Sequence, residues 1–189
     1  MSVLLLTALL VASLPHPTVA VCAVPFSFTS SNTFDTISCT NDSDSATFAV
    51  DASSSNSTVS SPSIYRVTGS GDGDTFSLSG PQKADSYNEI FVATGSGSGD
   101  VFTVFKGGVS NSTYQLTGGK GATFTVNAGN GSNSYTIAGG SGSIVSIAVG
   151  SSFKAKNTFS QQSFLIFVGS GSIVRITGGN ASTNLSVHM

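Results

Sequence analysis

The stretch Ile90-Phe-Val-Ala-Thr-Gly-Ser-Gly-Ser-Gly-Asp-Val-Phe-Thr-Val104 contains one complete unit of a repeat. Two short runs of alternating apolar and polar residues flank a glycine-rich arc. Arcs of the same form begin at Thr68, Thr117, Ala138 and Val168. A unit of this size cannot bury its own apolar face, so it must stack on its neighbours. The repeat therefore predicts a domain built from stacked units.

The runs on both sides of each arc have the period of a β-strand. After an arc, the third and fifth positions are large and apolar, so we expect a core ladder of Phe76, Phe102 and Phe124. Before an arc, the second and fourth positions face inward, which places Leu165 and Phe167 inside in the copy Phe164-Leu-Ile-Phe167. A slip of one residue would move every side chain to the opposite face of the sheet, so this constant register favours β structure throughout.

Copies of the strand that follows an arc start at residues 46, 74, 100, 122, 143 and 172. This spacing predicts an all-β fold, a β-solenoid with two strands per coil and about six coils. Joining each strand pair as a hairpin would instead give an antiparallel β-sandwich. The constant register and arc length favour the solenoid over the sandwich.

The N-terminal part of the chain predicts secretion. An apolar run too short to span a membrane ends in Thr18-Val-Ala20, which is typical of a signal peptide cleaved after Ala20. We therefore expect a signal peptide at 1–20, an N-terminal cap segment at 21–45, and the repeat domain at 46–189. Cys22 and Cys39 are the only cysteines, and in a secreted chain they are expected to form one disulfide.

Asn-X-Ser/Thr sequons predict a glycosylated, extracellular protein. They begin at Asn41, Asn56, Asn111, Asn130, Asn180 and Asn184. Asn56, Asn111, Asn130 and Asn180 fall on the longer connections opposite the glycine arcs. No segment after the signal peptide is long and apolar enough to predict a membrane span.

Residues typical of catalysis are scarce, and we expect no enzyme. His16 leaves with the signal peptide and His188 lies beside the C-terminus, so no usual general base remains for a serine nucleophile. Asp74 and Asp100 occupy equivalent positions in adjacent units, with Asp72 nearby. They allow an alternative, an acid/base pair in a polysaccharide-active enzyme.

The same three carboxylates are also candidates for Ca²⁺ binding beside glycine-arc carbonyls. The phrase Gly95-Ser-Gly-Ser-Gly-Asp-Val-Phe102 resembles the calcium-binding nonapeptide of RTX toxins, but it departs from that pattern at two glycines. Ala122, Ser143 and Ser172 stand where later copies would need aspartate. Ordinary turn chemistry is the simpler interpretation of these aspartates, so no cofactor is expected.

One outward face carries hydroxyls at Thr75-x-Ser77, Val101-x-Thr103 and Thr123-x-Thr125. Ranks of threonine on a β-solenoid look like the surface of β-helical antifreeze proteins. The resemblance implies ice binding, and a flat face would also suit an extracellular polysaccharide. Threonine on a solvent-facing strand is also a plain β-former.

The charges are few and unevenly distributed. The net charge of −2 predicts no attraction to nucleic acid. Residues 21–100 hold nine acidic and two basic side chains, a net charge of −7, whereas residues 101–189 hold five basic side chains and no acidic one. In a solenoid, one end would be acidic and the other basic, which favours head-to-tail contact between copies.

The run Phe164, Leu165, Ile166, Phe167 and Val168 is apolar on both faces, which makes it the candidate assembly interface. These features together predict a secreted, glycosylated structural protein, a subunit of an extracellular filament, coat or adhesive layer whose partner is a second copy of itself. An ice- or carbohydrate-binding module is the alternative hypothesis.

Overall fold

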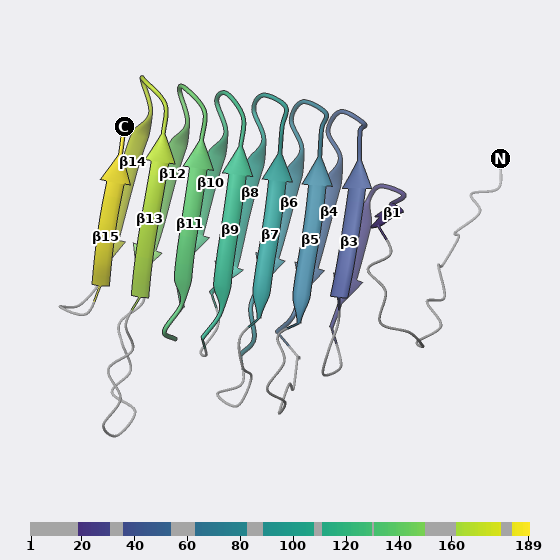
Figure 1. Ribbon diagram of the computed structural model, residues 1–189, viewed down its shortest axis with the longest axis horizontal. Helices are drawn as coiled ribbons and strands as arrows, with labels where there is room; N and C mark the ends of the chain where they lie inside the picture. The colour runs from purple at the N-terminus through teal and green to yellow at the C-terminus, as the bar shows by residue number, and fades with distance from the viewer. Residues whose placement is uncertain are drawn as a thin grey trace.

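A computed structural model describes residues 19–30, 36–53, 63–82, 89–107, 111–129, 131–149, 162–178 and 183–189. Its strands form two sheets that lie against each other (Figure 1). In order, the 8-stranded sheet contains β1 (Val19–Val21), β3 (Thr36–Asn41), β5 (Ile64–Gly69), β7 (Ile90–Gly95), β9 (Thr113–Gly118), β11 (Ser134–Gly139), β13 (Gln162–Val168) and β15 (Thr183–His188). The 7-stranded sheet contains β2 (Phe26–Thr29), β4 (Thr47–Asp51), β6 (Thr75–Ser79), β8 (Val101–Lys106), β10 (Thr123–Asn127), β12 (Ile144–Val149) and β14 (Ile173–Gly178).

Parallel pairing between coils confirms the predicted β-solenoid. In the 7-stranded sheet, for example, Phe76 pairs with Phe102 and Phe102 with Phe124, both in parallel register. Consecutive strands alternate between the two sheets, and each strand pairs with strands of the neighbouring coils. The hairpins of an antiparallel sandwich would pair consecutive strands instead, so that alternative is wrong.

The glycine arcs lie along one edge of the solenoid (Figure 1). Each arc needs a residue with positive φ, such as Gly73 at 72° or Gly99 at 74°. Among the described residues, Ser45, at 58°, is the only residue other than glycine that has a positive φ. Two residues earlier in the arc the coils approach closely. A Cβ on Gly97 would overlap the carbonyl group of Gly71 in the preceding coil. The arcs therefore stack backbone against backbone.

Aromatic ladders fill the space between the sheets. On the 7-stranded side Phe48, Phe76, Phe102 and Phe124 stack with ring centroids 4.6–5.0 Å apart. On the 8-stranded side a second ladder, which the sequence analysis did not single out, contains Tyr65, Phe91, Tyr114, Tyr135 and Phe164. Because equivalent residues of successive coils are in register, aromatic rings at the same position stack on one another along the axis.

The strand β13 corrects one expectation. Phe164 pairs with Tyr135 and Ile166 with Ile137, so Phe164 and Ile166 face the core while Phe167 faces outward. The expected register of this copy was therefore wrong by one residue. Alternation cannot set the register of a run that is apolar on both faces.

The segment 21–45, expected as an N-terminal cap, adds coils of the same kind. Its strand β2 pairs with β4, and β3 pairs with both β1 and β5. The predicted disulfide between Cys22 and Cys39 is present. The signal-peptide residues 1–18 lie outside the described part of the chain, and cleavage after Ala20 stays a prediction. Among the described residues, no helix has the length and apolar character needed to cross a membrane.

Candidate functional site: the two open ends

The C-terminal end of the solenoid exposes the edges of both sheets. In the described chain, β15 pairs only with β13, and β14 pairs only with β12. Because no further coil covers them, the inward residues Val174, Ile176 and Val187 are only partly buried. Leu185, which continues the column of Phe164, is 50% exposed. This end therefore presents an incomplete core with unpaired backbone beside it.

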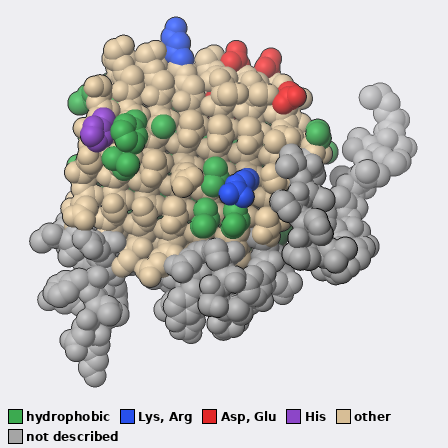
Figure 2. All heavy atoms as spheres, viewed as in Figure 1, with side chains coloured by type: hydrophobic (Ala, Val, Ile, Leu, Met, Phe, Trp, Pro, Cys, Tyr) green, Lys and Arg blue, Asp and Glu red, His purple; other side chains and the backbone are tan. Residues whose placement is uncertain are grey.

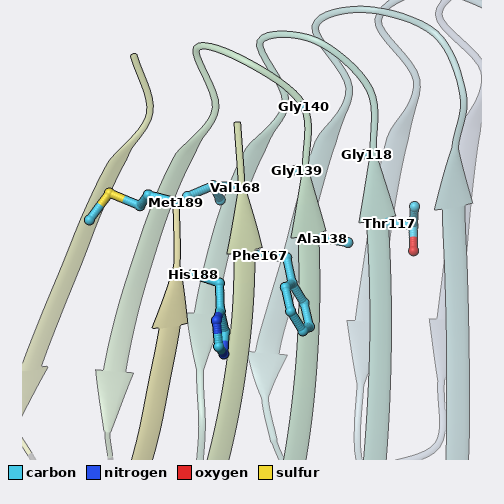
Figure 3. A pocket seen from close by; sticks show the side chains of 9 residues that line it. All are labelled: Thr117, Gly118, Ala138, Gly139, Gly140, Phe167, Val168, His188 and Met189. Atoms are coloured by element: carbon cyan, nitrogen blue, oxygen red, sulfur yellow. The ribbon is translucent and has the colours of Figure 1, made fainter. Parts of the chain in front are cut away.

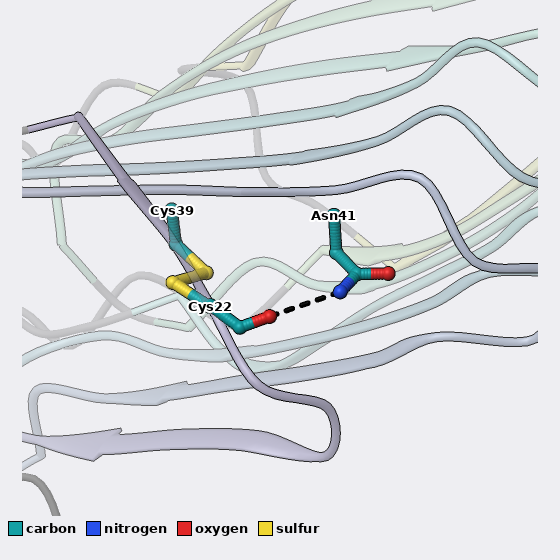
Figure 4. The surroundings of a disulfide bond; sticks show 3 residues. All are labelled: Cys22, Cys39 and Asn41. Carbon is teal, nitrogen blue, oxygen red and sulfur yellow. Dashed lines mark hydrogen bonds between the residues drawn. A yellow bond between two sulfur atoms is a disulfide. The ribbon is translucent and has the colours of Figure 1, made fainter.

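The N-terminal end is open in the same way. In the described chain, β1 pairs only with β3 and β2 only with β4, and the inward Val24, Phe26 and Phe28 are partly buried. The disulfide from Cys22 holds this first segment to β3 (Figure 4). The disulfide thus ties this end covalently to β3, and no further strand of the described residues pairs with β1 or β2 there.

The direction of the backbone groups at these edges follows from the ladder. Val101 N donates to Asp74 O and Thr123 N to Asp100 O, each at 2.8 Å, so outward residues donate to the preceding coil. In a parallel ladder the alternate, inward residues therefore direct their N–H groups to the following coil. At β15 those residues are Leu185 and Val187, whose N–H groups face the open end.

Charge follows the predicted gradient along the axis. The exposed carboxylates of Asp42, Asp44 and Asp72 lie on the first arcs, whereas the exposed Lys120 and Arg175 lie in later coils. Figure 2 shows acidic side chains at the arc edge over the N-terminal half and a basic one farther toward the C-terminal end. Arg66, on β5, is the exception among the described basic residues. Lys83, Lys154 and Lys156 lie outside the described residues.

Comparisons of the chain with known protein families, curated proteins and solved structures give no match.

The predicted assembly run Phe164–Val168 is divided by the fold. Phe164, Ile166 and Val168 are buried between the sheets and cannot contact another molecule in this conformation. Only Leu165 and Phe167 point outward, and Phe167 is 42% exposed. Of the predicted interface residues, Leu165 and Phe167 are therefore the two that could contact another copy. They lie on β13, one strand from the open edge.

A shallow groove of about 440 Å³ borders Phe167 on the outer face of the 8-stranded sheet (Figure 3). The Phe167 ring stacks on the His188 ring, with centroids 4.9 Å apart, and Gly118, Ala138 and Gly139 form a floor without large side chains. The stacked rings stand above this floor. They extend the apolar surface of the C-terminal end onto the face of the sheet.

The three candidate carboxylates do not form one site. Asp74 and Asp100 are fully buried, whereas Asp72 is exposed on its arc. Asp72 accepts hydrogen bonds from the backbone N–H of Ser98 at 2.7 Å and its hydroxyl at 3.0 Å, and these bonds lower the Asp72 pKa. Among the described residues, no three His, Cys, Asp or Glu side chains gather as metal ligands would. The burial of Asp74 and Asp100 also removes them from contact with a polysaccharide.

The sequons differ in accessibility. Asn111 and Asn184 are exposed, so a glycan on either would project into solvent. The side-chain amide of Asn41 already makes two hydrogen bonds. Its Nδ2 donates to Cys22 O at 2.9 Å (Figure 4), and its Oδ1 accepts from Ser43 N at 2.8 Å. Asn56, Asn130 and Asn180 lie outside the described residues.

A threonine column on the 8-stranded sheet was missed by sequence reasoning. Thr40, Thr68, Thr94 and Thr117 are aligned on four successive strands, all facing outward. On the other sheet, the predicted rank is interrupted in one column, since Val101 stands between Thr75 and Thr123, whereas Ser77, Thr103 and Thr125 are aligned as predicted. Thr68, Thr94 and Thr117 immediately precede glycines and were assigned to the arcs. Their recurrence at one position was the signal available in the sequence.

Proposed function

We propose that this protein is a secreted structural subunit that assembles head to tail into an extracellular filament, coat or adhesive layer. The observation that supports this function best is the incomplete core at both ends of the solenoid. The apolar side chains that are only partly buried against the core lie in the first and last coils. A second copy stacked end to end would cover them and continue both aromatic and aliphatic columns.

The direction of the strands supports a head-to-tail rather than a head-to-head contact. Every strand in each sheet is parallel, so an N-terminal end placed on a C-terminal end extends the same ladder. Cleavage after Ala20 would leave only Val21 of β1, so in the mature chain β14 would face β2 of the next copy, and β15 would face Val21 and β3. Such a contact joins two different surfaces and leaves both outer ends open, so it propagates into a filament.

The charge gradient supports the same polarity. Acidic side chains dominate the early coils, while Arg175 lies on the terminal strand β14. Opposite charges attract over about 10 Å at moderate salt, and this attraction fades as salt screens it. The disulfide indicates an oxidising compartment, in agreement with an extracellular location.

Placing a charge at the open end should stop assembly. Leu185→Lys directs an ammonium group toward the incoming copy, and inward-pointing charges block edge pairing. Leu185 is already half exposed, so the variant should fold. Analytical ultracentrifugation should show oligomers for the wild type at low salt and monomers for Leu185→Lys.

The matched control is Ser186→Lys, which adds the same charge to the exposed outer face of β15. This control should assemble like the wild type. Equal assembly by Leu185→Lys and the wild type would contradict the proposed contact.

The threonine column favours a second candidate, ice binding. Four aligned hydroxyl groups, repeating about every 4.8 Å as strands do, form a regular uncharged row. Ice recrystallisation should then be inhibited by the wild type and by Thr123→Lys on the opposite sheet, but not by Thr94→Lys. Absence of inhibition by the wild type would remove this candidate.

A further inference from the structure

Asp74 and Asp100 lie at the same position of adjacent coils, where an arc meets the 7-stranded sheet. Ala46 N donates to Asp74 Oδ1 at 2.8 Å, and Asp74 N donates to Asp100 Oδ1 at 3.1 Å. Each carboxyl group therefore accepts a backbone N–H of the preceding coil. Both side chains are fully buried. Together they link three successive coils from the inside.

The second oxygen of each carboxyl group is unsatisfied. Asp74 Oδ2 and Asp100 Oδ2 are buried and have no hydrogen-bond partner in the described part of the chain. Each carboxyl group occupies the space above a glycine, because a Cβ on Gly69 or Gly95 would overlap the carboxyl of Asp74 or Asp100. A buried carboxylate with an unpaired oxygen is strongly disfavoured relative to the neutral acid.

The charges that act on this pair are also acidic. Burial is the main cause that raises the pKa of both Asp74 and Asp100, and the nearby charge of Asp72 raises both further. Asp44 and Asp100 add to the effect on Asp74. The backbone N–H of Ala46 opposes the shift of the Asp74 pKa, and the backbone N–H groups of Asp74 and Gly119 oppose that of Asp100, without cancelling either.

We propose that Asp74 and Asp100 form a proton-dependent clamp, in which the folded protein keeps both carboxyl groups protonated on Oδ2 to a higher pH than an ordinary aspartate. The solenoid is then pH-sensitive at this junction. In the unfolded chain both groups ionise at about pH 4. Because their folded pKa is higher, the stabilisation is complete below that pH and is lost as the pH rises through the folded pKa. The clamp does not rest on end-to-end assembly, since both residues lie inside the solenoid.

The test is urea unfolding of the mature glycosylated protein across a pH series. For each group protonated only in the folded state, the folding equilibrium constant should fall about tenfold per pH unit. The double variant Asp74→Asn with Asp100→Asn keeps the acceptor oxygens but cannot ionise. The fall of the folding equilibrium constant with pH should therefore disappear in this variant. A fall as large as that of the wild type would overturn the proposal.

Asp72→Asn is the matched control. Asp72 is exposed with a lowered pKa, and its charge raises the pKa of both Asp74 and Asp100, so in this variant the fall should persist but end at a lower pH than in the wild type. A direct readout that needs no variant is the ¹³C chemical shift of the carboxyl carbons. As the pH is raised, Asp72 should ionise first, and Asp74 and Asp100 should ionise only above the pH at which an ordinary aspartate does. Ionisation of Asp74 and Asp100 together with Asp72 would also overturn the proposal.

Discussion

Replacing Phe102 by alanine should lower the free energy of unfolding by about 4 kcal/mol. Phe102 is fully buried, and its ring stacks between Phe76 at 4.6 Å and Phe124 at 4.8 Å. Its removal leaves a cavity that the rigid coil spacing cannot close and interrupts the ladder in its middle. Denaturation by urea, monitored by circular dichroism, measures the loss.

The control for this substitution lies on the same strand. Phe105 is 56% exposed on β8, so Phe105→Ala should change the free energy of unfolding by less than about 0.5 kcal/mol. Similar losses for Phe102→Ala and Phe105→Ala would mean that the aromatic ladder is not the core of the fold.

Replacing Gly97 by alanine should lower the free energy of unfolding by about 3 kcal/mol, because overpacking forces the backbone to move. The new Cβ would overlap the carbonyl group of Gly71 in the preceding arc, and a backbone group cannot swing aside as a flexible side chain can. The same urea experiment measures the effect.

Gly99→Ala separates this steric effect from backbone strain. A Cβ on Gly99 meets nothing within 4 Å, but the residue has a φ of 74°. The left-handed conformation alone should cost about 1 kcal/mol. If Gly97→Ala lowered the free energy of unfolding by no more than Gly99→Ala, the arcs would not be stacked as closely as described.

The coil repeat could be predicted because its evidence is periodic. The constant inward positions around Phe76 and Phe102 set the register in several copies at once, and one parallel topology satisfies them all. The register of Phe164–Phe167 could not be set in this way, since both faces of that run are apolar. The strand β2 was missed because no glycine arc of the repeat marks it.

The candidate site was predictable only in part. The sequence indicates the charge gradient and the last strand, but the exposure of Leu185 follows from which neighbours a strand lacks in space. The burial of Asp74 and Asp100 could likewise not be predicted, because an aspartate at the start of a strand is common in exposed turns. Here the glycines opposite them provide the space that encloses their carboxyl groups.

End-to-end assembly is tested most directly by electron microscopy of the mature, glycosylated protein across a salt series. The open ends and the charge gradient predict regular filaments at low salt that shorten as salt rises. Uniform monomers at every salt concentration would contradict the proposed structural role.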